Sequence, residues 1–139
     1  DDRPNGDGRL TRETGVMFVG QFRNGKLHGQ GTCLPVKGST YEGQWIAGVP
    51  DGQGVEMFAD GKTYVGQYTA GRKSGKGRLS WPDGRAYAGE FQAGCLHGAG
   101  ALGWPDGRKY EGQWFGNAMH GDGAFSWLDG RSYVGQFAH

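Results

Sequence analysis

The sequence has no glycine-free stretch longer than six residues, because 30 glycines are spread along its 139 positions. A globular helix averages about 11–12 residues, and each interior glycine costs it about 1 kcal/mol. The same spacing leaves no run of about 20 apolar residues that could span a membrane as a helix. The sequence therefore excludes helices and predicts strands and turns.

The sequence is also poor in Leu, Ile, Val and Phe and in cysteine, and its net charge is small. Only 22 residues are Leu, Ile, Val or Phe, and the formal net charge is +1. This charge, together with 18 aromatic residues, argues against a disordered linker and for a largely aromatic core. Two cysteines cannot form a disulfide framework, so we expect Cys33 and Cys95 to be free thiols in a reducing compartment. The sequence opens without a signal segment, and we expect an intracellular protein.

A 23-residue period organises the chain. Its first aromatic column contains Phe18, Tyr41, Tyr64, Tyr87, Tyr110 and Tyr133. A glycine, a second aromatic residue, a G-x-G pair and a turn glycine follow along the repeat, and four units have a further glycine before the G-x-G pair. In total 28 of the 30 glycines occupy these five columns. We divide the chain into a partial repeat (1–17), five repeats (18–40, 41–63, 64–86, 87–109 and 110–132) and a partial repeat (133–139). Because both ends fall inside a unit, we expect a segment of a longer array.

Each unit predicts a β-hairpin. Residues 41–45 alternate rings with polar residues and glycine, which is the period of a strand with two unlike faces. A second strand is expected from Gly52 to about Phe58, after a four-residue turn at 47–50. Pro, Asp and Gly at 82–84 favour a β-turn that links one hairpin to the next.

Closing the hairpin over four residues places Tyr41 opposite Glu56 and Trp45 opposite Gly52. Directly opposed residues share a face, so both aromatic columns lie on one side of the sheet. Bare glycines on the facing strand let each ring lie flat across it. The predicted fold is all-β: an elongated, single-layer, twisted antiparallel sheet of tandem 23-residue β-hairpins.

The pattern Y-x-G-x-W-x-x-G-x-x-x-G-x-G-x-x-x-x-x-D-G in residues 41–61 resembles the MORN repeat (membrane occupation and recognition nexus). The resemblance runs from about Gly6 to Phe137. It implies a non-enzymatic scaffold or adaptor that mediates protein–protein interaction and self-association. It also implies a cytoplasmic location, at the cytoskeleton or peripheral to a membrane. Two alternatives remain open, a phospholipid-binding membrane tether and the regulatory arm of a larger enzyme.

No motif in the sequence indicates catalysis. His28, His97 and His120 share one column, but successive hairpins lie about 10 Å apart, too far for one zinc ion that binds nitrogen at about 2.0–2.1 Å. We expect these histidines to bond to turn backbone, and the acids at 60, 83, 106 and 129 to belong to turns. We therefore expect no enzyme activity, cofactor, metal, small-molecule substrate or nucleic acid.

Two aromatic surfaces are candidate interaction sites. Part of the ring ladder in the middle units should stay exposed and form a groove for a helix or extended peptide of a partner. The groove residues are Tyr64, Trp81, Tyr87, Trp104 and Tyr110. The unpaired last strand predicts a homodimer through the carboxy-terminal units. The dimer contacts are Trp114, Phe125, Trp127, Tyr133 and Phe137.

A third candidate site is basic. No acid occurs between Asp60 and Asp83, whereas five bases do. Bases near a charged membrane attract anionic lipids with about 1 kcal/mol each. The candidate anionic phospholipid patch consists of Arg72, Lys73, Lys76 and Arg78.

Overall fold

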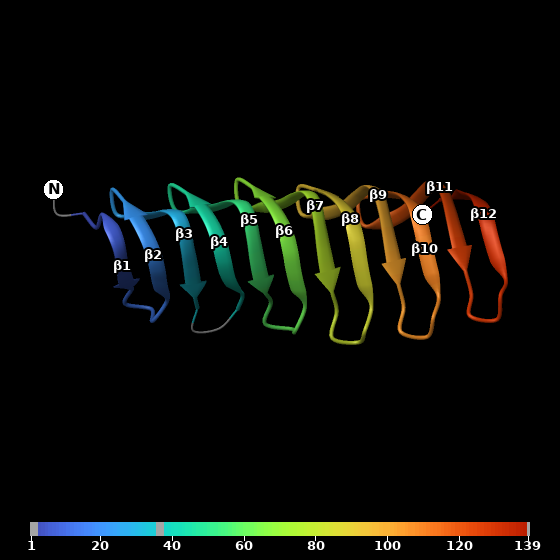
Figure 1. The fold of residues 1–139 in the computed structure, drawn as a ribbon, viewed down its shortest axis with the longest axis horizontal. Helices are drawn as coiled ribbons and strands as arrows, with labels where there is room; N and C mark the ends of the chain where they lie inside the picture. The colour runs from blue at the N-terminus through green and yellow to red at the C-terminus, as the bar shows by residue number, and fades with distance from the viewer. Residues whose placement is uncertain (1–2, 36–37, 139) are drawn as a thin grey trace.

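The structure is a computed structural model that describes residues 3–35 and 38–138. Residues 1–2, 36–37 and 139 of the predicted repeats lie outside the described part. Within it, twelve strands form one antiparallel sheet in sequence order, and no residue is helical (Figure 1). The expectation of an all-β, single-sheet array of hairpins is confirmed.

The strands alternate in length because each full repeat contributes a seven-residue strand and a nine-residue strand. They are β1 (Gly6–Thr11), β2 (Met17–Arg23), β3 (Lys26–Leu34), β4 (Thr40–Ile46), β5 (Val49–Met57), β6 (Thr63–Thr69), β7 (Arg72–Ser80), β8 (Ala86–Gln92), β9 (Cys95–Gly103), β10 (Lys109–Phe115), β11 (Ala118–Ser126) and β12 (Ser132–Phe137). The sheet is elongated, and its strands stand side by side along its length (Figure 1). Turns therefore lie along two opposite edges.

The turn inside each hairpin is shorter than the sequence predicts. Only Ala47 and Gly48 connect β4 to β5, with φ of 48° and 83°. Two central residues of positive φ are typical of a type I′ turn, whose twist matches that of the flanking strands. In the last hairpin Asn117 takes the position of Gly48 with φ of 72°, which asparagine tolerates better than most residues. We call this edge the hairpin rim; it contains turns 24–25, 47–48, 70–71, 93–94 and 116–117.

The shorter turn is accompanied by a β-bulge that changes the pairing. Gly43 pairs with Gly54, but Trp45 pairs with Pro50 and not with Gly52 as predicted. Between these two pairs β5 has two more residues than β4, so the ladder cannot continue in simple register. The prediction of Trp45 opposite Gly52 was wrong because it assumed an uninterrupted ladder.

A side chain stabilises the bulge. Gln44 Oε1 accepts a hydrogen bond from the backbone N–H of Gln53 at 2.6 Å. Gly52 has φ of 100°, and a Cβ there would collide with this Gln44 side chain. The same bond joins Gln67 to Lys76 at 2.9 Å. The first glycine of the G-x-G pair therefore makes the bulge sterically allowed.

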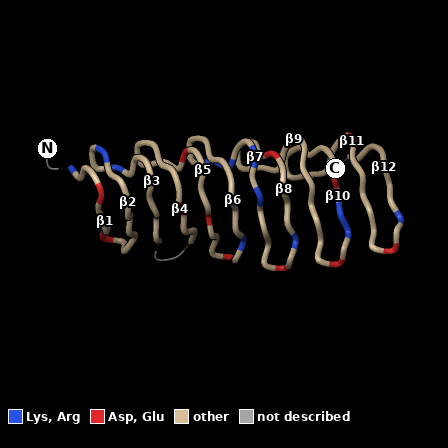
Figure 2. Tube along the Cα trace, in the orientation of Figure 1, with Lys and Arg blue, Asp and Glu red and all other residues tan. Residues whose placement is uncertain are grey.

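The opposite edge consists of the turns that link one hairpin to the next, and we call it the linker rim. Asp83 Oδ1 accepts a hydrogen bond from the Arg85 backbone N–H at 3.0 Å, and Gly84 N–H bonds to the Trp81 carbonyl at 3.1 Å. The last four linker turns each carry an acid followed by a base (Figure 2). The predicted turn role of these acids is confirmed.

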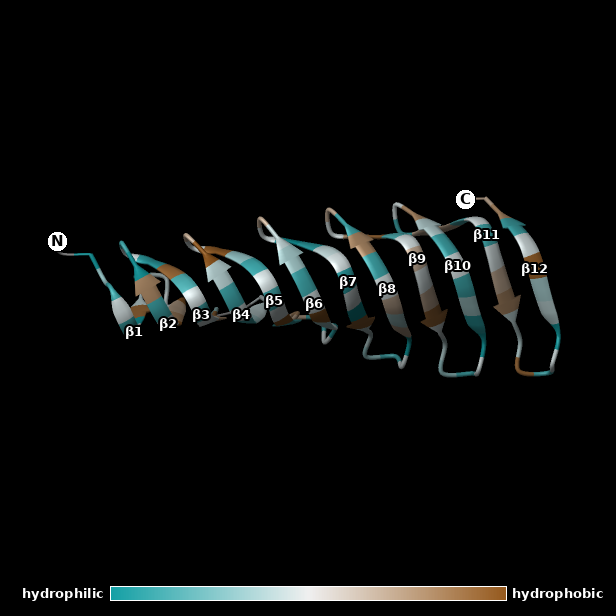
Figure 3. Cartoon of the chain, turned by 45° about the horizontal axis from the view of Figure 1, so that its top comes forward, coloured by the Kyte–Doolittle hydropathy of each residue, from teal (hydrophilic) through white to brown (hydrophobic). Residues whose placement is uncertain are grey.

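The two faces of the sheet differ. Along the strands hydrophilic and hydrophobic residues alternate (Figure 3), and Tyr41 and Trp45 are buried while Glu42 and Gln44 are exposed. We call these the ring face and the polar face. On the ring face one uninterrupted row of edge-to-face aromatic contacts runs from Phe18 to Tyr133.

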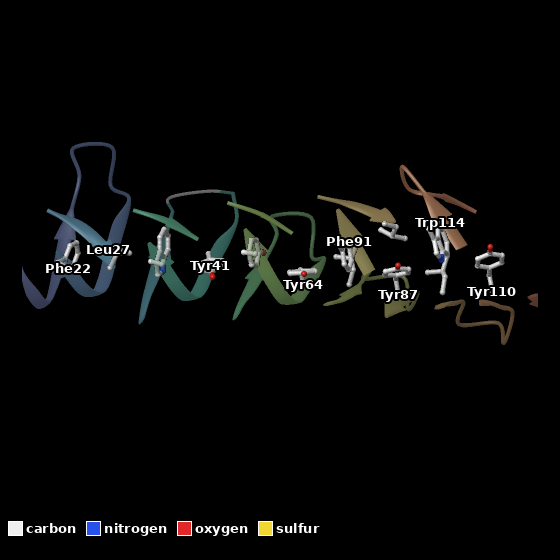
Figure 4. Close-up of a cluster of buried hydrophobic side chains, with 13 residues drawn as sticks. Phe22, Leu27, Tyr41, Tyr64, Tyr87, Phe91, Tyr110 and Trp114 are labelled. Carbon is white, nitrogen blue, oxygen red and sulfur yellow. The ribbon is translucent and has the colours of Figure 1, made fainter. Parts of the chain in front are cut away.

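This row supplies most of the buried core, which Phe22 and four leucines complete (Figure 4). Tyr64 and Tyr87 lie in its middle, with 0% of their surface exposed. The Tyr87 hydroxyl donates to the Glu90 carbonyl at 2.8 Å, and its ring lies over Gly100 of the neighbouring strand. Each pair of perpendicular rings contributes about 0.5–1.5 kcal/mol beyond its buried area. A single sheet can therefore bury a core without a second layer.

Candidate functional site

A groove of about 330 Å³ lies on the ring face between the two rims. Its linker-rim side is formed by Phe58, Lys62, Trp81 and Arg85, and its hairpin-rim side by Gly94, Leu96 and Asn117. Strands β7, β9 and β10 add Lys73, Leu79, Leu102 and Trp114. Four adjoining repeats therefore supply one apolar surface with cations at its edge.

The linker-rim side is held by a tryptophan–arginine contact that recurs in three linker turns. The Arg85 guanidinium lies 4.8 Å from the Trp81 ring centre, while its Nε donates to Asp83 Oδ2 at 2.9 Å. Hydrogen bonding from the Arg85 backbone holds the pKa of Asp83 below its ordinary value. Trp104 and Trp127 have matching arginine contacts at 5.1 and 5.3 Å. Trp81 therefore enters the groove in a fixed orientation.

Lys73 brings a half-buried ammonium to the groove. Its Nζ lies 4.7 Å from the Phe58 ring centre and 5.6 Å from that of Tyr64. Burial lowers the pKa of Lys73, an effect that the charge of Glu56 opposes. The charged form therefore lacks the solvation that it has in water.

The polar face also has hollows, one of them about 420 Å³ in volume. Its lining includes Gln30, Gln44, Gln53 and Val55 but no aromatic ring. Gln44 already stabilises the bulge, so this surface offers fewer anchors for a ligand. Aromatic anchors commonly dominate binding energy, and this favours the groove on the ring face.

The five residues of the predicted partner groove divide into two groups. Trp81 lines the groove, and Trp104 is half-buried in the next repeat. Tyr64, Tyr87 and Tyr110 have 0% exposure, because rings of adjoining repeats cover them. A partner on this face can contact the two tryptophans but not the three tyrosines. The use of the groove by a partner stays a prediction.

Sequence reasoning missed most of the groove residues. The missed residues are Phe58, Lys62, Arg85, Leu79, Leu96 and Leu102. Lys73 was predicted only as a member of the lipid patch, and not as a groove residue. The 23-residue register contained a signal for three of them, since Leu27 and Leu96 share one column and Leu79 and Leu102 share another. Leucines at ring-face positions could have been assigned to the groove from their alternation with polar neighbours.

Four of the predicted dimer contacts adjoin one another at the carboxy-terminal end of the sheet, whereas the fifth, Trp114, is buried. Trp114 is 5% exposed, and its Nε1 donates to the Gly100 carbonyl at 3.0 Å inside the ring row. Tyr133 is 45% exposed on β12, which pairs only with β11 among the described residues. Phe125, Trp127 and Phe137 are partly buried in the last two strands and the turn between them. Homodimerisation stays a prediction.

The four bases of the predicted lipid patch lie on opposite faces of β7. Lys73 pairs with Tyr68 on the ring face, whereas Arg72, Lys76 and Arg78 are exposed on the polar face. Across the strands Lys76 pairs with Glu90, an acid that offsets its charge. A lipid surface could meet three of the four bases at once, and the patch stays a prediction.

The histidine column contacts the next hairpin. His28 Nδ1 accepts a hydrogen bond from the Ala47 backbone N–H at 3.2 Å, and Asp51 in the same column accepts from Ala70 N–H at 3.0 Å. His97 instead packs against Phe115, with ring centres 5.2 Å apart. Among residues 3–35 and 38–138, no group of three or more potential ligands could hold a metal ion. In the same ranges no helix is suited to crossing a membrane.

An open sheet of matching hairpins, with a groove along one face, defines a β-ribbon repeat protein. A family model for the MORN repeat matches residues 18–40, 41–63, 64–84, 87–107 and 110–130. The chain therefore belongs to the MORN-repeat family, and the resemblance seen in the sequence is confirmed. No curated protein matches it.

Two solved structures have limited similarity to the chain. One is the SAS-4 (dCPAP) TCP domain in complex with a proline-rich motif of Ana2 (dSTIL) of Drosophila melanogaster, which is 13% identical with a TM-score of 0.41. That match covers 99% of this chain and 96% of that one. The other is a catalytically inactive virginiamycin B lyase from Staphylococcus aureus with quinupristin, which is 14% identical with a TM-score of 0.21. It covers 96% of this chain and 41% of that one. Neither likeness is close enough to transfer a function.

Proposed function

We propose that this chain is a non-enzymatic scaffold segment that binds a partner protein on its ring face. The observation that carries the proposal is the groove, which Trp81 lines together with Leu79 and Leu102, two core residues that are 8% and 7% exposed. Such a preformed apolar surface with polar edges is typical of recognition sites. MORN repeats are generally non-catalytic modules, which supports a binding role.

Peptides chosen by display selection against the purified protein test this function. Trp81→Ala should weaken the binding of groove peptides by more than about 2 kcal/mol, because an aromatic anchor is lost. The matched control is Trp127→Ala, which removes a rim tryptophan with the same arginine contact outside the groove. Equal effects of the two variants on every selected peptide would contradict a role for the groove.

We also propose self-association through the carboxy-terminal repeat, in the cytoplasm at a cytoskeletal or membrane-associated structure. Support comes from β12, where Tyr133 is 45% and Val134 79% exposed. Exposed strands with free pairing groups are normally covered by another chain or element. A monomer mass by light scattering at tens of micromolar would rule out the dimer.

Phospholipid binding is the second candidate function, favoured by three exposed bases on the polar face of β7. Changing Arg72, Lys76 and Arg78 to Glu should abolish binding to phosphatidylserine vesicles at low salt. Binding by the parent protein should fall as salt rises, since exposed charges are screened over about 10 Å at 0.1 M. Vesicle binding that survives the triple substitution counts against this candidate.

A further inference from the structure

The ring face is polar at one place where the other repeats are apolar. Lys73 stands in a column whose other members are Pro4, Leu27, Pro50, Leu96 and Met119. Glu56 stands in a column whose other members are Leu10, Cys33, Leu79, Leu102 and Phe125. Tyr68 brings a hydroxyl to a column of Phe and Trp. Three independent columns therefore become polar between the second and third full repeats.

The three polar side chains lie close together. The Tyr68 hydroxyl donates to Glu56 Oε1 at 2.5 Å, which gives that carboxylate a partner. Lys73 pairs with Tyr68 across β6 and β7, and its ammonium lies over Phe58 and Tyr64. Glu56 does not line the groove, whereas Lys73 does. The cluster therefore presents its cation, and not its acid, to the groove.

Lys73 differs from the two other cations of the groove. Lys62 lies 3.3 Å from the Asp60 carboxylate, and Arg85 lies 2.9 Å from that of Asp83. Lys73 contacts rings and forms no ion pair with a carboxylate in the described part of the chain. The charge of Glu56 acts on Lys73, but no carboxylate of the described residues touches its half-buried ammonium, so an incoming carboxylate would supply the direct ion pair that Lys73 lacks.

We propose that the groove recognises an extended acidic segment of a partner protein, with one carboxylate on Lys73 and a neighbouring large apolar side chain against Trp81. Leu79, Leu96 and Leu102 form the floor beneath this side chain with the 7–8% of their surface that stays exposed. Two of the three cations in the lining are paired with acids of the linker rim, which leaves Lys73 as the cation that a carboxylate of such a segment would meet. A bilayer is the weaker fit, because the half-buried Lys73 lies between two rims while the exposed bases of β7 are on the other face. This inference rests on the proposed function and specifies its partner.

The experiment compares each selected peptide with a counterpart in which its Asp and Glu residues are replaced by Asn and Gln. Binding to the parent protein should weaken by about tenfold or more on this replacement, as expected for a lost charge-assisted bond. Lys73→Leu should cause a similar loss and reduce the salt dependence, while Lys73→Arg should retain most of the affinity. Lys73→Leu should fold normally, because leucine occupies this column in two other repeats.

The matched control is Lys76→Leu, which removes the same charge from the same strand on the polar face. If peptides depend on Trp81 but lose equal affinity with Lys73→Leu and Lys76→Leu, the acidic specificity is wrong and the groove function stands. If no peptide depends on Trp81, the groove function itself is wrong. A third outcome is that the parent protein binds phosphatidylserine vesicles and that Lys73→Leu abolishes this binding. The ligand of the groove would then be a lipid, and the inference would be wrong.

Discussion

The second glycine of the G-x-G pair should be required by the neighbouring tyrosine ring, and β9 allows a controlled test. A Cβ on Gly100 would come within 3.0 Å of the Tyr87 hydroxyl and ring carbons, closer than real Cβ atoms approach. A Cβ on Gly103 would meet nothing within 4 Å. Both glycines lie in one strand and have no positive φ, so steric contact with the ring is the main difference.

The expected loss of stability in Gly100→Ala follows from the contacts that the displaced Tyr87 ring would lose. Tyr87 makes edge-to-face contacts with Phe91 and Trp114 at 5.2 and 5.4 Å, each worth about 0.5–1.5 kcal/mol. Its hydrogen bond to the Glu90 carbonyl adds about 0.5–1.5 kcal/mol. Because partial displacement loses part of this sum, we expect the free energy of unfolding to fall by about 2–3 kcal/mol. Gly103→Ala should instead raise it by about 0.4–1 kcal/mol by restricting the unfolded chain.

Urea unfolding followed by tryptophan fluorescence and far-UV circular dichroism measures both variants. Repeat arrays can unfold in steps, so the unfolding transitions seen by fluorescence and by circular dichroism must first coincide. The urea midpoints of the variants are then compared, provided that the dependence of the unfolding free energy on urea has the same slope. In a Tyr87→Leu background the added methyl of Gly100→Ala should cost little, because the ring is gone. Equal stability of the Gly100→Ala and Gly103→Ala proteins, or an undiminished cost with Tyr87→Leu, would refute the steric argument.

Three further predictions concern pH, the turns and the polar cluster. Burial raises the pKa of Tyr87 to about 12, so stability should be constant below about pH 10 and fall toward pH 12; early tyrosinate absorbance in a still-folded protein would contradict this. Ala70 has φ of 50°, so Ala70→Gly should raise the free energy of unfolding by about 0.5–1 kcal/mol, whereas Ala88→Gly inside β8 should lower it in the same urea assay. Tyr68→Phe should cost about 1–3 kcal/mol by leaving Glu56 without its donor, and adding Glu56→Leu should restore much of the loss, a result that calorimetry checks.

The sequence alone predicted the fold class and the hairpin unit. Alternation with period two assigned Tyr41 and Trp45 to one face, and the pairing of Tyr41 with Glu56 agrees with the structure. These features depend on residues that are neighbours within one repeat. A 23-residue period that recurs without insertions therefore makes them visible in the sequence. The room that glycine leaves for a ring, as at Gly100, could be predicted for the same reason.

The accessible part of the candidate site could not be predicted in this way. Tyr87 and Trp81 are both ring-face aromatics, yet Tyr87 is fully buried while Trp81 lines the groove. The difference arises because the rings of Phe91 and Trp114 cover Tyr87 within β8, whereas Trp81 lies outside the strands, in the linker turn after β7. Exposure therefore depends on packing between repeats, which composition and period do not specify.

Two other features were decided only by the tertiary structure. The bulge that sets Trp45 opposite Pro50 depends on Gln44 reaching a backbone N–H in the next strand, a contact that strand alternation does not reveal. Lys73 and Glu56 are 17 positions apart and belong to different columns of different repeats. The sequence by itself determined which residues lie on the ring face. Cross-strand pairing and the β-bulge determined which of these residues contact one another, because such contacts join positions that are distant along the chain.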